Sequence, residues 1–241
     1  MNHLILVGCS LGEQWSMILE DPSSTLFDGQ AIHPFSLEAD RVSSYMMGGG
    51  GNAHGVHGLL NEVLMHGSDI KNMRIVCQLT GVDRKSIVME DDKQGAGVSI
   101  KNALTGTNEK IMTDGGHTRN LYGAENMRAV FNTVKMAPYS TIRDLTSILC
   151  MLGSLGADVY VFRGWEGCMP KNLWKTISKL LNSHSVITYP GTYMDVAVRK
   201  SVINPSYNWL DDKHPGTQLA AESITWLLNQ MVKEEKLIYV K

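Results

Sequence analysis

Short apolar runs alternate with longer segments of helical period along most of the 241-residue chain. The runs have the length and β-branched content of buried strands, whereas the longer segments repeat apolar residues at i, i+3, i+4 and i+7. Such alternation is typical of βαβ units, in which helices cover a parallel sheet. We expect strands at 4–7, 42–47, 74–79, 159–162 and 186–189, and helices at 53–66, 142–152, 173–181 and 217–232. The pattern predicts an α/β fold, a three-layer α/β/α sandwich around a five-stranded, mostly parallel sheet of flavodoxin-like type.

One long stretch interrupts this rhythm. Residues 84–137 are rich in Gly, Asn, Asp and Thr and hold only short apolar pieces, which indicates an insertion after the third strand. In a compact domain such an insertion is usually a lid, a small β-hairpin or an interaction surface. We expect residues 1–241 to form a single domain that carries this insertion.

Composition narrows the classes of partner. The formal net charge is -2 and the sequence has no Lys- or Arg-rich run, so a nucleic acid is not an expected partner. The apolar run at 4–7 is too short for a signal-peptide core or a membrane span. The four cysteines form no C-x-x-C pair, which fits free thiols in a reducing compartment. We expect a cytoplasmic protein with no membrane partner, and the sequence leaves the oligomeric state open.

Three unusual stretches follow the first three predicted strands. In an open parallel sheet, ligands bind where the carboxyl ends of the strands meet, so we expect the three stretches to converge on one edge. The stretches are Gly8-Cys9-Ser10, Gly48-Gly49-Gly50-Gly51-Asn52 and Thr80-Gly81-Val82-Asp83-Arg84.

The first stretch contains a candidate nucleophile, Ser10. A serine hydroxyl needs a base to remove its proton, and the base needs a partner that fixes its tautomer. Asp211 and His214 lie three residues apart before the last predicted helix, and they can provide the base and its partner. The backbone after the second strand and the side chain of Asn52 could then hold an oxyanion.

These residues together resemble the SGNH, or GDSL-like, hydrolases. In that family a nucleophilic serine follows the first strand, a glycine the second and an asparagine the third, and Asp-x-x-His precedes the last helix. The resemblance covers nearly the whole chain except the insertion. It implies that Ser10 is the nucleophile, His214 its base and Asp211 the partner of His214, with the amides of Gly51 and Ser10 as oxyanion donors.

The resemblance also implies an activity. It predicts a serine esterase without metal or organic cofactor that forms an acyl-enzyme and acts on a small-molecule or glycan ester, such as an O-acyl group on a carbohydrate. The Gly-Asn after the second strand and Gly81-Val82-Asp83-Arg84 are similar to compact SGNH-like proteins of tailed phages. A phage-encoded protein of this kind could be associated with the virion.

Two positions depart from the family pattern. Cys9 stands where the commonest form has aspartate, and Asp83 stands where the family has an asparagine. An ionised Asp83 would repel an oxyanion, so Asn52 takes over as donor, or Asp83 pairs with Arg84, or catalysis is impaired. The alternatives to an esterase are therefore a catalytically eroded binding or structural module and an O-acyltransferase.

Three of these features also have other interpretations. Gly8-Cys9-Ser10-Leu11-Gly12 also matches the nucleophile elbow of α/β-hydrolases, but that elbow follows several strands because an earlier loop supplies part of the oxyanion hole. Asn52 could be the N-cap of the helix at 53–66. Trp165 could line a substrate pocket or plug the end of the sheet.

Three histidines, His54, His57 and His66, suggest a metal site at first sight. The sequence offers no third ligand close to the first two, so no metal is expected. We expect these histidines to be solvated or to contact substrate.

Overall fold

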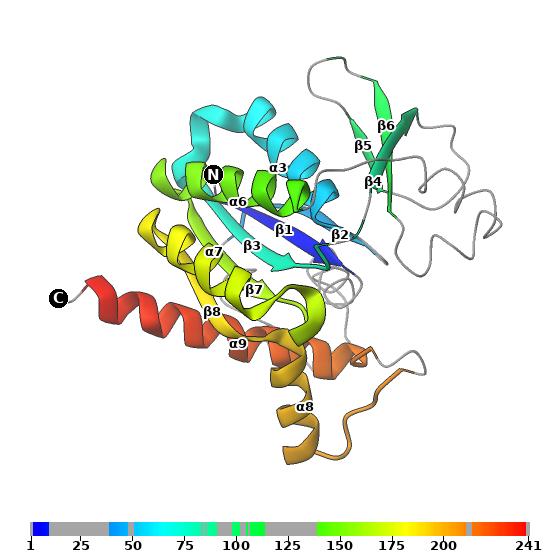
Figure 1. The fold of residues 1–241 in the computed structure, drawn as a ribbon, viewed down its shortest axis with the longest axis vertical. Helices are drawn as coiled ribbons and strands as arrows, with labels where there is room; N and C mark the ends of the chain where they lie inside the picture. The colour runs from blue at the N-terminus through cyan, green and yellow to red at the C-terminus, as the bar shows by residue number, and fades with distance from the viewer. Residues whose placement is uncertain are drawn as a thin grey trace.

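The computed structural model describes residues 2–9, 39–47, 51–82, 84, 86–90, 98–101, 105, 107–113, 139–210 and 214–239. Its centre is a five-stranded sheet in the order β2-β1-β3-β7-β8, and every neighbouring pair is parallel (Figure 1). The strands are β1 (His3–Cys9), β2 (Arg41–Met47), β3 (Met73–Leu79), β7 (Asp158–Arg163) and β8 (Val186–Thr192). All five predicted strands and the flavodoxin-like order are confirmed.

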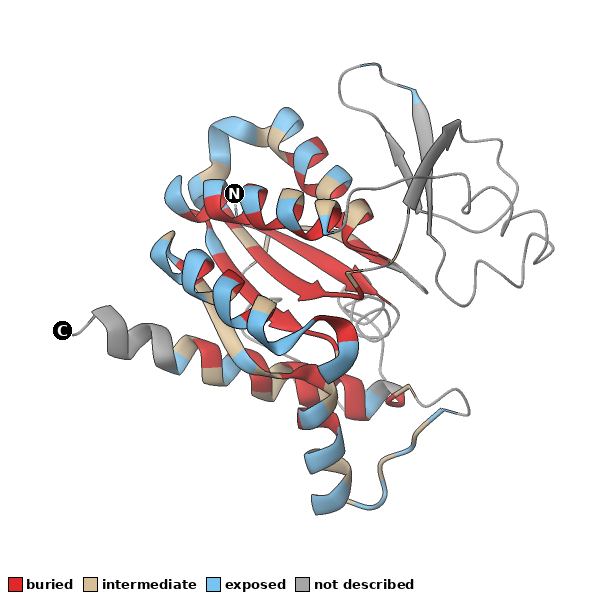
Figure 2. Cartoon of the chain, in the orientation of Figure 1, coloured by how far each residue is buried: buried red, intermediate tan, exposed pale blue. Residues whose placement is uncertain are grey.

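Two helical layers cover the sheet (Figure 2). One layer consists of α3 (Asn52–His66), α6 (Ser140–Ser154) and α7 (Lys171–Ser183), and the other of α8 (Tyr193–Ile203) and α9 (Thr217–Tyr239). Each layer encloses its own apolar cluster, because side chains of a buried strand alternate between the faces. Thus Ile5 and Val7 face the first layer, and Leu4 and Leu6 face the second. This confirms the three-layer sandwich.

Two glycines bring α3 close to the sheet. A Cβ atom added at Gly55 would lie 2.4 Å from Val7 Cγ1, and one added at Gly58 would lie 2.4 Å from Cγ of the Tyr45 ring. Glycine weakens a helix interior. Its presence at 55 and 58 is explained by the short distance between α3 and the sheet. The close approach sets the first turn of α3 directly over the ends of β1 and β2.

One helix of the second layer is absent from the sequence prediction. Helix α8 begins directly after β8, where Thr192 and Asp195 form a capping box. Tyr193, Val196 and Ala197 are buried, whereas Val202 and Ile203 are 75% and 80% exposed. Its apolar residues therefore do not form a single stripe, which is the pattern that predicts a helix.

The region predicted to be an insertion contains a second, separate sheet. Its antiparallel strands are β4 (Ser86–Glu90), β5 (Val98–Lys101) and β6 (Asn108–Thr113), in the order β4-β6-β5. Figure 1 shows this sheet apart from the five-stranded one. A small β-hairpin is one of the three alternatives considered for the insertion; the sheet is antiparallel and has three strands.

All four cysteines lie in the core. The four cysteines are buried thiols rather than disulfides, as predicted.

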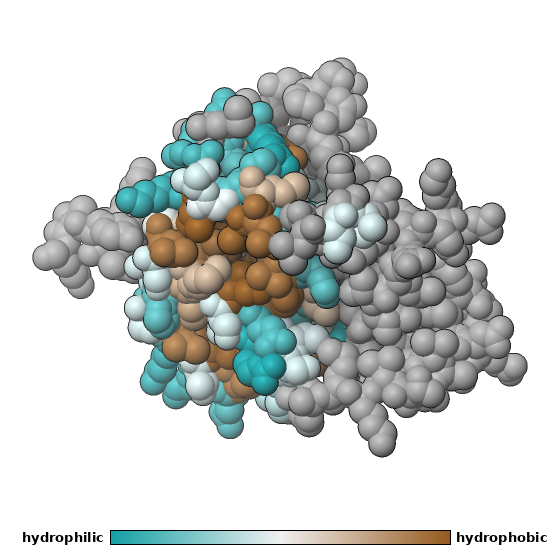
Figure 3. Space-filling model, turned by 90° about the horizontal axis from the view of Figure 1, so that it is seen from above, coloured by the Kyte–Doolittle hydropathy of each residue, from teal (hydrophilic) through white to brown (hydrophobic). Residues whose placement is uncertain are grey.

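Apolar side chains gather on the outer face of α3 and α6 (Figure 3), where Leu60, Leu64 and Met151 are each at least 40% exposed. Among the described helices, none has both the length and the apolarity needed to cross a membrane.

Candidate functional site

The carboxyl ends of β1, β2 and β3 are neighbours at one edge of the sheet. Strand β1 lies between the other two, with Cys9 beside Met47 of β2 and Val7 beside Cys77 of β3. Side chains from α3 and β3 link the segments that follow these strands. The predicted convergence of the three stretches is confirmed for their described residues.

The second and third stretches are joined by Asn52 and Thr80. Asn52 Oδ1 accepts a hydrogen bond from the backbone N–H of Thr80 at 3.0 Å and another from its hydroxyl at 3.2 Å. Asn52 Nδ2 donates to the carbonyl oxygen of Thr80 at 3.3 Å. Asn52 is 2% exposed and is the first residue of α3, while Gly51 is the N-cap. Asn52 is therefore not the N-cap; its side chain fastens α3 to the end of β3.

His54, in the first turn of α3, joins this helix to the ends of β1 and β2. Its Nε2 lies 2.7 Å from the carbonyl oxygen of Gly8 in β1 and 2.7 Å from that of Tyr45 in β2. Because both partners are acceptors, Nε2 carries the proton and donates to both. Burial lowers the pKa of His54 to about 4, against the opposing effect of the carbonyl bonds, so the imidazole is neutral at pH 7.

The expectation for the histidines is wrong for His54, which is fully buried and holds backbone carbonyls. A residue between glycines near a helix start looks solvated in the sequence, but the close approach of α3 to the sheet encloses it. His57 is exposed and His66 is partly exposed. Among the described residues, no group of three or more His, Cys, Asp or Glu side chains could hold a metal ion.

Gln78, near the end of β3, joins this strand to Cys9 of the first stretch and was missed in the sequence. Its Oε1 lies 3.2 Å from the backbone nitrogen of Cys9 and 3.3 Å from Cys9 Sγ. Both Gln78 and Cys9 are 1% exposed. The signal that could have found Gln78 is its position as a polar residue inside the apolar run of β3. The Gly8–Cys9 peptide is thus held by a side chain of the neighbouring strand.

The segment that carries His214 leads into α9. The N–H of Leu210 donates to the carbonyl oxygen of His214, and that of Gly216 donates to Asn208, each at 2.8 Å. A Cβ atom at Gly216 would lie 2.6 Å from the Asn208 oxygen, so only glycine permits this approach. The N–H of Ala220 then donates to the carbonyl of Gly216, which places Gly216 at the start of α9.

The start of α9 lies at the same end of the sheet as the tips of β1 and β3 (Figure 1). His214 is three residues before α9 and is partly buried. The two ends of the chain that carry the candidate nucleophile and base are therefore directed to one edge. Ser10, Asp83 and Asp211 lie outside the described residues, and so do Gly48, Gly49 and Gly50.

Trp165 follows β7 at this end of the sheet. It packs against the apolar cluster of the first helical layer, and the guanidinium carbon of Arg84 lies 5.0 Å from its ring centroid. Arg84 therefore makes a cation–π contact with Trp165. Both residues are partly exposed.

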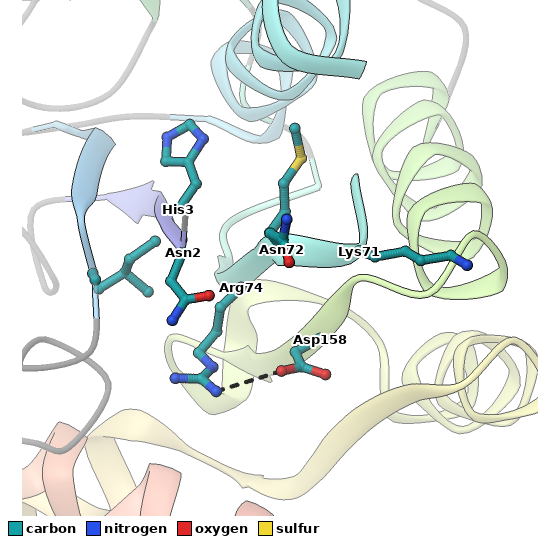
Figure 4. Close-up of a pocket in the computed structure, with 9 residues that line it drawn as sticks. Asn2, His3, Lys71, Asn72, Arg74 and Asp158 are labelled. Atoms are coloured by element: carbon teal, nitrogen blue, oxygen red, sulfur yellow. Dashed lines mark hydrogen bonds and ion pairs between the residues drawn. The ribbon is translucent and has the colours of Figure 1, made fainter. Parts of the chain in front are cut away.

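A pocket elsewhere in the molecule is unrelated to these residues (Figure 4). It lies at the amino ends of β1, β3 and β7, where Asn2, Arg74 and Asp158 line it. Arg74 is paired with Asp158 at 3.5 Å, and the Lys71 side chain extends away from this pair. The pocket is thus at the opposite end of the sheet from the candidate site.

Comparisons with known proteins add distant neighbours. No family model and no curated protein matches the chain. A crystal structure of TesA is 14% identical and covers 97% of this chain and 99% of its own, with a TM-score of 0.43. The psychrotrophic esterase EstA from Pseudoalteromonas sp., inhibited by monoethylphosphonate, is 12% identical and covers 97% and 98%, with a TM-score of 0.40. The α/β fold is established by the strand order of the sheet and by the two helical layers that cover it.

Proposed function

We propose that this protein is a serine esterase of the SGNH type. The observation that carries the proposal is the linkage of the ends of β1, β2 and β3 by His54, Asn52 and Gln78, with α9 starting at the same edge. In this arrangement the residue after Cys9, the N-cap Gly51 of α3 and the segment before α9 can share one site. These are the positions that the resemblance to SGNH hydrolases assigns to nucleophile, oxyanion donors and base.

Each residue has a chemical role in the proposed reaction. The Oγ atom of Ser10 attacks the ester carbonyl while His214 removes its proton, and Asp211 stabilises the resulting imidazolium. The amides of Ser10 and Gly51 and the side chain of Asn52 donate to the oxyanion of the tetrahedral intermediate. His214 then gives the proton to the departing alcohol, and a water molecule activated by His214 hydrolyses the acyl-enzyme.

The fixed orientation of Asn52 supports its proposed role. Two donors of Thr80 face Oδ1, so the carboxamide cannot rotate without placing Nδ2 against them. One N–H of Nδ2 is directed to the Thr80 carbonyl oxygen, and in the proposed reaction the second donates to the oxyanion. A donor fixed in advance costs no reorganisation during the reaction, which is how an oxyanion hole acts.

The proposed substrate is a polar ester, such as an O-acyl group on a carbohydrate, with Trp165 as one wall of the binding site. An aromatic ring that is partly exposed beside a catalytic edge offers an apolar surface to a sugar ring or an acyl group. Transfer of the acyl group to a sugar hydroxyl instead of water is the O-acyltransferase alternative. Product analysis with and without a sugar acceptor separates the two reactions.

A second candidate function is a binding or structural module with an eroded site. Asp83 and Cys9 favour it, because an aspartate in the donor segment opposes an oxyanion, and the buried thiol of Cys9 already bonds to Gln78. Such a module would bind glycans tightly and would not react with acyl esters.

Hydrolysis of short acyl esters tests the proposal. We expect turnover by the wild-type protein and a fall in kcat of about 1,000-fold or more in Ser10→Ala and His214→Gln, because triad members act as a unit. Circular dichroism checks that both variants fold. A Ser10→Ala variant that cleaves the ester as fast as wild type would contradict the assignment.

A further inference from the structure

Gln78 occupies an unusual place for a polar residue. It is the second-to-last residue of β3, the central strand, and is 1% exposed. Buried parallel strands are normally apolar on both faces. Ile75, Val76, Cys77 and Leu79 of the same strand follow that rule. A polar group at this depth must be explained by what it contacts.

The contacts of Gln78 fix the orientation of its carboxamide. Oε1 accepts from the backbone N–H of Cys9 at 3.2 Å and from Cys9 Sγ at 3.3 Å. A backbone N–H can only donate, so the oxygen and not the nitrogen of the carboxamide faces Cys9. Nε2 is buried and has no hydrogen-bond partner within the described part of the chain.

Two glycines lie against this side chain, Gly8 in β1 and Gly164 directly after β7. A Cβ atom at Gly8 would lie 3.0 Å from both Cβ and Oε1 of Gln78. On the other side, a Cβ atom at Gly164 would lie at an ordinary contact distance, 3.6 Å, from Gln78 Nε2, so the close approach is to Gly8. Glycine weakens a strand. At position 8 of β1 it leaves the space that the Gln78 side chain occupies. An apolar residue of the same size at 78 would fill this space without burying a carboxamide.

We propose that Gln78 is a positioning residue for the nucleophile. Gln78 accepts a hydrogen bond from the backbone N–H of Cys9 and so fixes the direction in which the backbone leaves β1. This direction determines the position of Ser10, the next residue. Gln78 acts through Cys9 and does not touch the substrate. The inference rests on the proposed esterase function and adds a residue that the resemblance to SGNH hydrolases does not assign.

The test replaces the carboxamide while keeping its volume. Gln78→Met removes the hydrogen bonds and retains the length of the side chain, whereas Gln78→Glu retains an acceptor for the Cys9 N–H. Thr146→Val is the matched control, because it removes a buried hydrogen bond, from Thr146 Oγ1 to Ile142 at 2.6 Å, inside α6. Steady-state kinetics on a short acyl ester is the first readout, and amide hydrogen exchange at Cys9 is the second.

We expect Gln78→Met to lower kcat by about 10- to 100-fold with KM nearly unchanged, since small displacements of a reacting group have effects of this size. Gln78→Glu recovers most of the loss, and Thr146→Val keeps the wild-type kcat. In Gln78→Met, the Cys9 amide exchanges faster while the Ile5 amide, deeper in β1, is unchanged. If Gln78→Met fails to fold, Gly8→Ala displaces the same carboxamide and should lower kcat in the same way.

The failures of the two proposals are distinguishable. An active wild-type protein whose Gln78→Met variant matches Thr146→Val in kcat overturns the role of Gln78 alone. Unchanged exchange at Cys9 in Gln78→Met also overturns it. A wild-type protein without hydrolase activity overturns the proposed function, and the catalytic role of Gln78 with it.

Discussion

The side chain of Asn52 and the backbone of Thr80 exchange hydrogen bonds, with Thr80 N–H donating to Oδ1 at 3.0 Å and Nδ2 donating to Thr80 O at 3.3 Å. The pair joins the first turn of α3 to the end of β3. It also places the carboxamide of Asn52 at the edge where the resemblance to SGNH hydrolases puts the oxyanion. One residue therefore has both a structural and a proposed chemical role.

Removing this carboxamide should affect both stability and catalysis. Asn52→Ala leaves the buried N–H of Thr80 without its partner, so we expect the free energy of unfolding to fall by about 1 to 3 kcal/mol. Loss of an oxyanion donor should lower kcat by about 100-fold or more. Denaturant titration and ester kinetics measure the two effects.

Thr80→Val is the matched control for Asn52→Ala. It removes only the hydroxyl bond to Asn52 Oδ1 at 3.2 Å and leaves both backbone bonds. We expect its kcat to stay close to that of the wild-type protein. An equal loss of kcat in both variants would contradict the donor role of Asn52, because Thr80→Val keeps its carboxamide and both backbone bonds.

The buried imidazole of His54 makes stability depend on pH. Its pKa is about 4 in the folded protein, whereas an unperturbed histidine has a pKa of 6.5. Between these values the unfolded chain binds the proton and the folded one does not, so stability is complete above about pH 6.5 and falls as the pH drops towards 4. The loss is about 3 kcal/mol in total, and His3, whose pKa is lowered mainly by burial, acts in the same direction.

Unfolding measured by denaturant at pH 7, 6, 5 and 4 checks this dependence. His54→Gln can still donate to the carbonyls of Gly8 and Tyr45 but does not titrate. Its stability should therefore change less over the same range. Identical pH dependence in the variant and the wild-type protein would show that another group causes the loss.

A charged cluster at the opposite end of α3 should affect stability alone. Glu62 is 1% exposed, accepts a hydrogen bond from the Tyr45 hydroxyl at 2.7 Å, and lies 3.6 Å from both Arg41 and His3. Glu62→Gln keeps an acceptor for Tyr45 but removes the charge that faces Arg41. We expect the free energy of unfolding to fall by about 1 to 3 kcal/mol, as for other disrupted hydrogen bonds to charged groups.

Esterase kinetics of Glu62→Gln provide the contrast with the site variants. Glu62 is ten positions beyond Asn52 along the helix, at the level of the amino ends of β1 and β2 where His3 and Arg41 lie. The kcat should equal that of wild type after correction for folded protein. A selective loss of kcat would connect this cluster to catalysis.

Two glycines in and beside α3 should respond in opposite ways to alanine. A methyl group at Gly58 would meet the Tyr45 ring at 2.4 Å, whereas one at Gly67 would meet only Val63 at 4.0 Å. Gly58→Ala should lower the free energy of unfolding by about 1 to 3 kcal/mol through overpacking. Gly67, at φ -60 and ψ -18, has a backbone that alanine adopts readily, so Gly67→Ala should raise it by about 0.4 to 1 kcal/mol. Thermal unfolding of both variants compares the signs directly.

Much of the fold could be predicted because the apolar pattern reflects burial. The runs that became β1, β3 and β7 are buried on both faces of a parallel sheet and contain few polar residues. Helix α8 was missed because Val202 and Ile203 are exposed on it and disturb the apolar stripe. The pairing of Thr192 with Asp195 three residues later was the available signal for its start.

The candidate site was predictable as a set of strand ends but not as a network. Strand order and the direction of parallel strands place the three stretches on one edge. Which side chains connect them depends on distances across the sheet, and the sequence does not contain these. His54 and Gln78 reach backbone groups 46 and 69 positions away, so no local spacing indicates their partners.

Reaction with a fluorophosphonate tests the central claim most directly, because an activated serine displaces the fluoride and keeps the phosphonyl group on Oγ. Mass spectrometry of the digested protein then locates the adduct. Our account predicts one adduct per chain, on Ser10, that forms in the wild-type protein and is lost in Ser10→Ala and His214→Gln. A wild-type protein that remains unlabelled, or a Ser10→Ala variant labelled at the wild-type rate, would contradict it.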